Sequence, residues 1–297
     1  MSIMLSTPSV DELSPAAEVL KRWQYDGGPL HLHSGDLGWY SLSGAEATAA
    51  ALRMWSRDGE VLAIGLLDGP QLLRMAIAPH WRDDEELAHQ IAADVDEPAC
   101  GVLVRGGATV EARGAEPLIQ VLLERGWERD DPWTPFHRTL SDPVEDCGLR
   151  IETIGPDRAE EWVTVHWSAF RGSTFTDADR RLRVGRWLAM AGGPFYGDAR
   201  SLMAFDEHDN AVAVATVWSA GPGRPGLLEP MGVHRRHRGH GYGTAITLAA
   251  AAALRDMGSS SASVCVESSN VGAVATYASA GFTPSADVAD LRRGPRG

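Results

Sequence analysis

Hydrophobic positions along the first half of the chain recur with two spacings, one near 3.6 residues and one of two. The first is typical of amphipathic helices and the second of strands with one buried face. An Asp68-Gly69-Pro70 sequence between two apolar runs is typical of a tight turn between strands. These patterns predict helices at residues 14–25, 44–57, 83–95 and 117–125, and strands at 61–67, 72–78, 101–105 and 127–140.

The second half of the chain repeats this order of elements. A stretch at 141–148, which contains proline and acidic residues, separates the two sets and is typical of a linker. The chain is therefore predicted to form two domains, 1–142 and 148–297, each with its own hydrophobic core. In the second domain, helices are predicted at 158–170, 177–190 and 244–257, and strands at 201–205, 211–218, 227–233 and 261–267.

The most informative segment runs from Val233 to Thr244, between a predicted strand and a long predicted helix. Its glycines lead into the helix, where several backbone N–H groups point at one spot with the helix dipole behind them. Such a turn binds phosphate or pyrophosphate groups. No lysine follows the glycines, as a nucleotide-hydrolysing loop requires, and their spacing does not fit a dinucleotide fingerprint. The pattern that fits is R-x-x-G-x-G, at Arg238, Gly241 and Gly243.

A second block follows the predicted strand at 261–267. Asn270 is placed to cap a helix that contains Tyr277, and Gly281 is placed to end it before Phe282. The order is thus strand, glycine turn, helix, strand and asparagine-capped helix.

Together these two blocks resemble the GNAT superfamily of acyl-CoA-dependent N-acyltransferases. The resemblance is most specific over residues 227–282 and is consistent from residue 149 onward. It implies an α/β (α+β) fold with two tandem GNAT-like domains, each a mixed, mostly antiparallel central sheet flanked by helices.

The two halves differ where the second carries its glycine turn. The first half has Trp81-Arg82-Asp83-Asp84-Glu85-Glu86 in that place, without a glycine. Acidic residues stabilise the start of a helix, but four carboxylates would repel a pyrophosphate. We therefore expect a degenerate first domain without a CoA pyrophosphate loop, and one active site per chain. This arrangement is similar to that of tandem acyltransferases, which include mycothiol synthase-like enzymes.

The resemblance implies that acetyl-CoA is the co-substrate. Its pyrophosphate would lie on the glycine turn and its acyl-pantetheine arm along the strand that ends at Val233, whose N–H would donate to the thioester carbonyl. Asn270 would contact the pantetheine arm, cap its helix, or do both. The residues implied to bind acetyl-CoA are Met231, Gly232, Val233, Arg238, Gly239, His240, Gly241, Tyr242, Gly243, Thr244 and Asn270.

Two residues are implied to carry the chemistry. Tyr277 matches the family tyrosine whose hydroxyl serves as general acid toward the CoA sulfur, with simple packing on the sheet as the alternative. Glu229 is the one carboxylate within the predicted strand at 227–233. It is either a general base, acting directly or through water, or a structural residue paired with an arginine.

The acceptor is predicted to be a primary amine of a small molecule or a peptide. In the family it lies opposite CoA, beside the first two helices of the domain. Trp167, Phe170 and Trp218 are the candidate contacts, although most aromatic residues of this region are expected to be core. In the first half, the polar and aromatic residues at 35–40 are expected to help close the cleft.

Composition narrows the function further. Lys and Arg number 27 and Asp and Glu 40, and the resulting net charge of −13 argues against nonspecific nucleic-acid binding. Three scattered cysteines give neither a disulfide framework nor a metal site. No signal peptide or membrane span is recognisable, so a cytoplasmic monomer or homodimer without a membrane partner is expected.

Two other functions stay open at this point. One is a catalytically silent acyl-CoA-binding regulatory protein, which the presence of both Glu229 and Tyr277 argues against. The other is a NAD-dependent oxidoreductase that would use Glu267 at a strand end to bind ribose. The missing third glycine argues against it.

Overall fold

The computed structural model describes residues 2–171 and 173–294. The first half contains five α-helices and six strands in this described part, joined by short turns and 3₁₀ helices such as η3 (Pro79–Trp81). The helices are α1 (Leu13–Trp23), α2 (Ser34–Tyr40), α3 (Ala45–Ala51), α4 (Glu85–Asp96) and α5 (Glu116–Glu124). The strands are β1 (Met4–Ser6), β2 (Leu52–Arg57), β3 (Glu60–Leu67), β4 (Leu72–Ile77), β5 (Ala108–Glu111) and β6 (Glu128–Thr139).

The second half repeats a helix pair, a set of strands and a second helix pair. Its helices are α6 (Ala159–Phe170), α7 (Asp177–Ala191), α8 (Tyr242–Asp256) and α9 (Val271–Ser279), and the 3₁₀ helix η7 (Arg235–His237) precedes α8. Its strands are β7 (Arg150–Thr153), β8 (Ala199–Phe205), β9 (Ala211–Trp218), β10 (Gly226–Val233), β11 (Ser261–Glu267), β12 (Thr283–Pro284) and β13 (Val288–Arg293).

The strands of both halves join in one continuous sheet. Its order is β1-β2-β3-β4-β5-β13-β6-β11-β10-β9-β8-β7, with β12 also paired to β6. Within the described residues, β4–β5 and β10–β11 are the parallel pairs and the other neighbours are antiparallel. The predicted mixed, mostly antiparallel sheet is thus confirmed.

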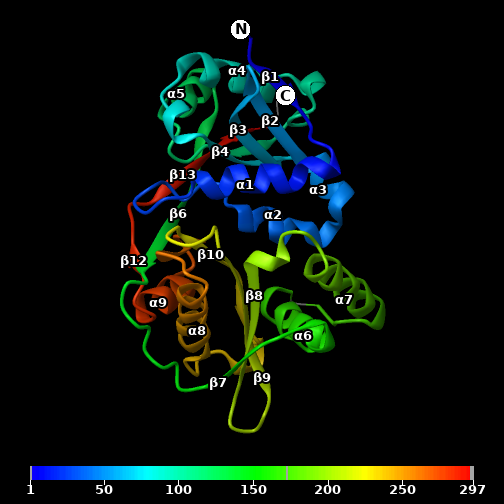
Figure 1. The fold of residues 1–297 in the computed structure, drawn as a ribbon, viewed down its shortest axis with the longest axis vertical. Coiled ribbons are helices and arrows are strands. Elements are labelled where there is room, and N and C mark those ends of the chain that lie inside the picture. The colour runs from blue at the N-terminus through cyan, green and yellow to red at the C-terminus, as the bar shows by residue number, and fades with distance from the viewer. Residues whose placement is uncertain (1, 172, 295–297) are drawn as a thin grey trace.

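Two strands pair with strands of the other half. The late strand β13 lies between β5 and β6 of the first half, and β6 in turn pairs with β11 of the second half. In Figure 1 the chain end that carries β13 accordingly runs back up toward the N-terminal elements. The halves therefore share backbone hydrogen bonds as well as side-chain contacts.

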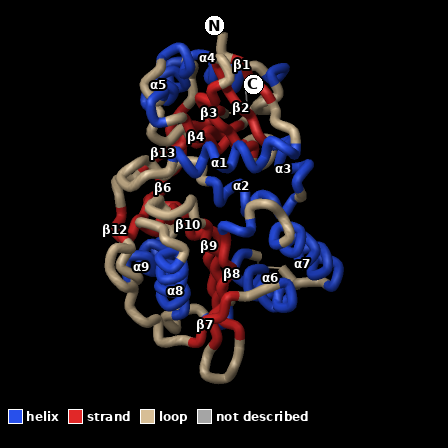
Figure 2. The backbone as a smooth tube through the Cα atoms, in the orientation of Figure 1, coloured by secondary structure: helices blue, strands red, loops and turns tan. Residues whose placement is uncertain are grey.

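Helices cover both faces of this sheet. In the second half, α8 and α9 lie on one face and α6 and α7 on the other, while α2 lies between the halves (Figures 1 and 2). One hydrophobic cluster joins α1 and α2 to α6 and α7, through residues such as Leu20, Leu37, Trp162 and Trp187. Among the helices described, none has the length and apolar character needed to cross a bilayer.

Two sequence predictions for the first half are wrong. The predicted helix at 44–57 ends at Ala51, and Leu52 starts β2, which pairs with both β1 and β3. The strand predicted at 101–105 is a turn, where Gly101 has a φ of 69° and its carbonyl accepts bonds from the Arg53 guanidinium. In both places sheet pairing and long-range contacts override the local pattern.

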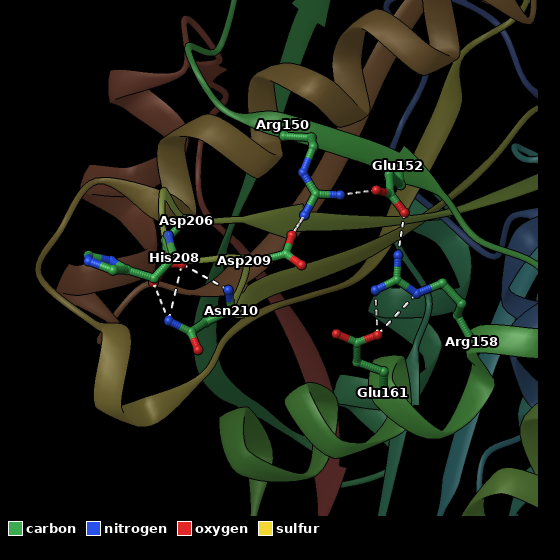
Figure 3. A network of polar contacts seen from close by, with 8 residues as sticks. All are labelled: Arg150, Glu152, Arg158, Glu161, Asp206, His208, Asp209 and Asn210. Atoms are coloured by element: carbon green, nitrogen blue, oxygen red, sulfur yellow. Dashed lines mark hydrogen bonds and ion pairs between the residues drawn. The ribbon is translucent and has the colours of Figure 1, made fainter.

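A network of ion pairs ties the far end of the second half together (Figure 3). Arg150 of β7 bridges Glu152 and Asp209, and Arg158 bridges Glu152 and Glu161 of α6. The Asp209 side chain is 83 % exposed. Exposed pairs of this kind contribute about 0–1 kcal/mol each, so the network is a minor part of the stability.

Candidate active site

The strands β10 and β11 separate soon after they begin. They pair at Gly226 and Leu227, and the ladder between β10 and β9 is irregular between Leu228 and Met231. The resulting opening, called here the β10–β11 cleft, has a volume of about 510 Å³. Its lining includes residues 228–231 of β10, residues 264–267 of β11, and Asn270, Ala273 and Tyr277.

Backbone donors of β10 face this cleft. The N–H of His234 donates to the carbonyl of Val212 in the ladder with β9. Because hydrogen-bonded and non-bonded pairs alternate along antiparallel strands, the N–H groups of Val233 and Met231 point away from β9. They are therefore available on the side where β11 has moved away.

The glycine turn opens α8 without a side-chain cap. Gly239 and Gly241 both have φ of 81°, a left-handed conformation that favours glycine, and Gly241 is the N-cap of α8. In the described part of the chain, no side-chain cap accepts from the first amides of α8. The turn borders a cavity of about 610 Å³, called here the glycine-turn groove, whose lining also includes residues 231–233 and Thr276.

Two arginines connect this turn to the end of α6. Arg238 donates to the carbonyl of Ala169 at 2.8 Å, and Arg235 donates to the carbonyl of Ser168 at 3.0 Å. The Arg235 guanidinium also donates to the carbonyl of Arg171. The end of α6, whose Phe170 borders the groove and the cleft, is thus fixed to the glycine turn.

Glu229 lies in the β10–β11 cleft, and its side chain remains 33 % exposed. Burial raises the pKa of Glu229 to about 8; the Arg74 guanidinium opposes the rise, while Asp36 and Glu111 add to it. The distance from Arg74 Nη1 to Glu229 Oε1 is 3.8 Å. A carboxyl group with such a pKa can accept a proton near neutral pH.

The first half of the chain supplies most of the other charged residues that line this cleft. Arg74 of β4 forms ion pairs with Asp36 of α2 at 2.9 Å and with Glu111 of β5 at 3.2 Å. The Asp36 side chain is 1 % exposed. The sequence indicates that residues 35–40 lie near the cleft, but no local pattern points to Arg74 or Glu111.

Tyr277 lines the same cleft from α9. Its ring is buried beside Phe136 and Phe282, with centroid distances of 5.7 and 6.2 Å. Burial, together with the nearby Glu229 carboxylate, raises the pKa of Tyr277. Its hydroxyl therefore stays protonated through the neutral range and can donate a proton.

Comparison with known proteins identifies the fold and the chemistry. Residues 159–282 match the Acetyltransferase (GNAT) family. The chain is also similar to a mycothiol acetyltransferase of Thermobispora bispora, with 32% identity over 259 residues, covering 80% of this chain and 85% of that one. The chain belongs to the GNAT acetyltransferase family. It is therefore an acyltransferase, and the oxidoreductase alternative is wrong.

Further similarities extend along most or all of this GNAT chain. A mycothiol acetyltransferase of Segniliparus rotundus is 26% identical over 267 residues, covering 81% of this chain and 94% of that one. A tandem GNAT protein from the clavulanic acid biosynthesis pathway superposes with a TM-score of 0.64 at 16% identity, covering 100% of this chain and 99% of that one. The predicted tandem GNAT fold is thereby confirmed.

In this GNAT protein most of the predicted site residues lie together. The amide of Ala273 donates to the Asn270 side chain, which therefore caps α9 and also borders the groove and the cleft. Trp167 and Phe170 border a third cavity, the α6–α7 cavity, which also reaches Glu229. His240 is exposed and does not border the groove among the described residues.

Trp218 does not contact any of these three cavities, which corrects the expectation that it lines the acceptor pocket. It is 1 % exposed and its indole N–H donates to the carbonyl of Glu229. A Cβ added to Gly35 or Gly38 would lie within 2.4 Å of its atoms, so α2 packs directly on this indole. Trp218 therefore holds the backbone of Glu229 in place without lining these cavities.

In the corresponding turn of the first half, a side chain of the protein itself occupies the helix start. The Asp84 side chain accepts from the amide of Leu87 at 2.7 Å and caps α4, which continues with Glu85 and Glu86. This cap amide is thus satisfied by the chain itself. Within the described residues, no group of three or more His, Cys, Asp or Glu is arranged to hold a metal ion.

Proposed function

We propose that this enzyme transfers an acetyl group from acetyl-CoA to a primary amine of a small molecule or a peptide. The observation that carries the proposal is that the glycine-turn groove and the β10–β11 cleft adjoin, since both are lined by Phe170, Met231, Asn270 and Ala273, and that Glu229 and Tyr277 both line the cleft. The family uses acetyl-CoA as its co-substrate. A donor would therefore reach both residues from one open path.

The residues around the groove fit this co-substrate. The uncapped amides after Gly241 and the positive charge of Arg238 suit a pyrophosphate. Gly239 and Gly241 leave space for its approach, since a Cβ at either position would meet no atom within 4 Å. Residues 231–233 and Asn270 would then hold the pantetheine arm between α9 and β10.

The chemistry divides among three groups of the chain. Acetyl-CoA supplies an activated acetyl thioester. Glu229 takes the proton from the attacking ammonium, because an amine with a pKa of about 10.4 is not nucleophilic while protonated. The N–H of Val233 donates to the carbonyl oxygen as the N–C bond forms, and Tyr277 gives its proton to the departing sulfur as the C–S bond breaks. The nitrogen, positively charged after the attack, then loses its second proton, which returns to the Tyr277 oxygen and leaves a neutral amide.

The relatives suggest which amine to test first. Both of these relatives are named mycothiol acetyltransferase, so we propose the amine substrate of that enzyme as the first acceptor to examine.

We also propose that the chain divides into two domains, 1–142 and 148–297, and that the first domain forms a wall of the acceptor site through Asp36 and Arg74. Three free cysteines, one of them exposed, support a reducing compartment such as the cytoplasm.

Release of the CoA thiol during incubation with acetyl-CoA and a panel of amines tests the proposal. We expect thiol release that depends on an amine and yields an N-acetyl product of the corresponding mass. Binding of acetyl-CoA without turnover of any amine would instead support the regulatory protein.

A further inference from the structure

The α6–α7 cavity has a charge distribution that the transfer of an acetyl group does not require. It has a volume of about 550 Å³, within the range of small-molecule sites. One side contains Glu229 with Asp36, Asp68 and Arg74, where we propose that the acceptor amine lies. The other side contains three further arginines, Arg171, Arg183 and Arg186.

These three arginines have no ion-pair partner in the described part of the chain. None of them forms an ion pair with a carboxylate, whereas Arg180 on the same helix α7 pairs with Glu160 at 3.1 Å. The Nε atom of Arg183 is buried without a hydrogen-bond partner. This is unexpected in a protein with a net charge of −13, where carboxylates outnumber basic side chains.

The arginines also oppose one another. Burial, and then the charges of Arg186 and Arg171, lower the pKa of Arg183, and the Asp179 carboxylate only partly opposes them. Like charges gathered at the edge of a cavity destabilise the free protein, and an anion between them would remove that repulsion. A guanidinium binds carboxylate and phosphate groups in a fixed, two-point geometry.

The wall between the two sides is aromatic and uncharged. His166 stacks on Trp162 with ring centroids 5.2 Å apart and lies 4.7 Å from the ring of Phe170. Burial lowers the pKa of His166 to about 4, so this ring is neutral at pH 7. The Arg183 guanidinium lies over Trp167 at 5.6 Å, which fixes its position on this wall.

We infer that the acceptor of this enzyme carries an anionic group, a carboxylate or a phosphate, which binds Arg183 and Arg186 while its amine faces Glu229. An apolar or aromatic spacer would lie along the wall formed by Trp162, His166 and Phe170. This inference rests on the proposed function, and it names the acceptor class for the same site. Acetyl-CoA does not need these arginines, because the glycine-turn groove has its own cation, Arg238.

Matched acceptor pairs test the inference. The first pair is 4-(aminomethyl)benzoate and 4-(aminomethyl)benzamide, which differ in charge but hardly in shape. The second pair is phosphoethanolamine and ethanolamine, which tests for a phosphate. We expect KM for the anionic member of at least one pair to be about 10-fold lower than for its neutral partner.

Substitutions of the arginines then test whether the lower KM for anionic acceptors depends on this cavity. The double variant Arg183→Gln, Arg186→Gln should raise KM for the anionic acceptor about 10-fold or more, and leave KM for acetyl-CoA and for the neutral acceptor unchanged. Arg181→Gln is the matched control, because Arg181 is exposed on the same helix and does not border the cavity. The single variant Arg186→Gln, at an exposed position, serves if the double variant does not fold.

Two results would overturn the inference. One is equal KM for the charged and neutral members of both pairs, and the other is an equal effect of Arg181→Gln and the double variant. If no amine is turned over, the proposed function fails, and titration of tryptophan fluorescence with benzoate and phenyl phosphate decides about the cavity. The anion site is supported if these ligands bind the double variant more weakly than they bind both the wild type and Arg181→Gln. It is excluded if they bind all three proteins equally, or bind none of them.

Discussion

The starts of α4 and α8 occupy the same place in the two halves but have opposite properties. Each follows a strand and a 3₁₀ helix, β4 and η3 in one half, β10 and η7 in the other. At α4 the Asp84 carboxylate accepts from a helix amide, whereas at α8 the N-cap is Gly241, which has no side chain to do so. The same backbone arrangement therefore serves stability in the first half and leaves donors free for a ligand in the second.

The first half contributes a charged residue next to Glu229. Its strand β4 carries Arg74 at the position where β4 and β5 still pair, and this guanidinium lies 3.8 Å from Glu229 of the other half. The half whose helix start is capped by Asp84 thus supplies charge beside Glu229 of the half that carries the glycine turn. The comparison predicts different consequences for mutations at the two places.

The largest effect is expected from Gly241→Asp, which gives α8 the carboxylate that closes α4. The new side chain would accept from the free amides and repel the pyrophosphate, so affinity for CoA should fall at least about 100-fold in calorimetric titration. Gly59→Asp is the control, because Gly59 has a φ of 84° and open surroundings outside the site. Wild-type affinity in Gly241→Asp would show that the turn does not bind the co-substrate.

A smaller but still large effect is expected from Tyr277→Phe. Loss of a general acid should lower kcat about 100-fold with little change in KM for acetyl-CoA. Tyr196→Phe is the control, since Tyr196 is half-buried and its hydroxyl donates to Ser201, at 2.9 Å, outside the β10–β11 cleft. Unchanged kcat in Tyr277→Phe would mean that this ring only packs against the sheet.

The link between the halves predicts a pH dependence. Glu229 accepts a proton only in its charged form, so kcat should rise as the pH increases through about 8. Because Arg74 lowers the pKa of Glu229, Arg74→Met should move this rise to higher pH and lower kcat at pH 7, by about tenfold if the pKa of Glu229 increases by about one. Arg74→Lys keeps the charge and should restore part of the profile. Superimposable profiles for all three proteins would exclude Glu229 as the base that Arg74 controls.

The smallest effect is expected at α4. Asp84→Ala removes a helix cap and should lower the free energy of unfolding by about 1 kcal/mol, measured in urea, without changing acetylation. Asp83→Ala removes an equal charge from an exposed neighbour and should change stability by less than about 0.5 kcal/mol. A loss of CoA affinity in Asp84→Ala would contradict the assignment of the co-substrate to α8 alone.

The sequence predicted those parts of the site that depend on short-range signals. The glycine turn, the cap at Asn270 and the strand β11 follow from residue types within a few positions, and their structures agree. The network of Asp36, Arg74 and Glu111 could not be predicted, because these residues are brought together by sheet pairing and by α2. Trp218 was misplaced for a related reason, since its neighbours Gly35 and Gly38 come from the other half.

The position of β13 also has a consequence for how the molecule is made. β5 and β6 are consecutive strands of the first half, but β13 separates them in the sheet. Until the ribosome has produced the entire second half, both strands therefore keep an unpaired edge. The first half can therefore complete its sheet only after the second half has been synthesised.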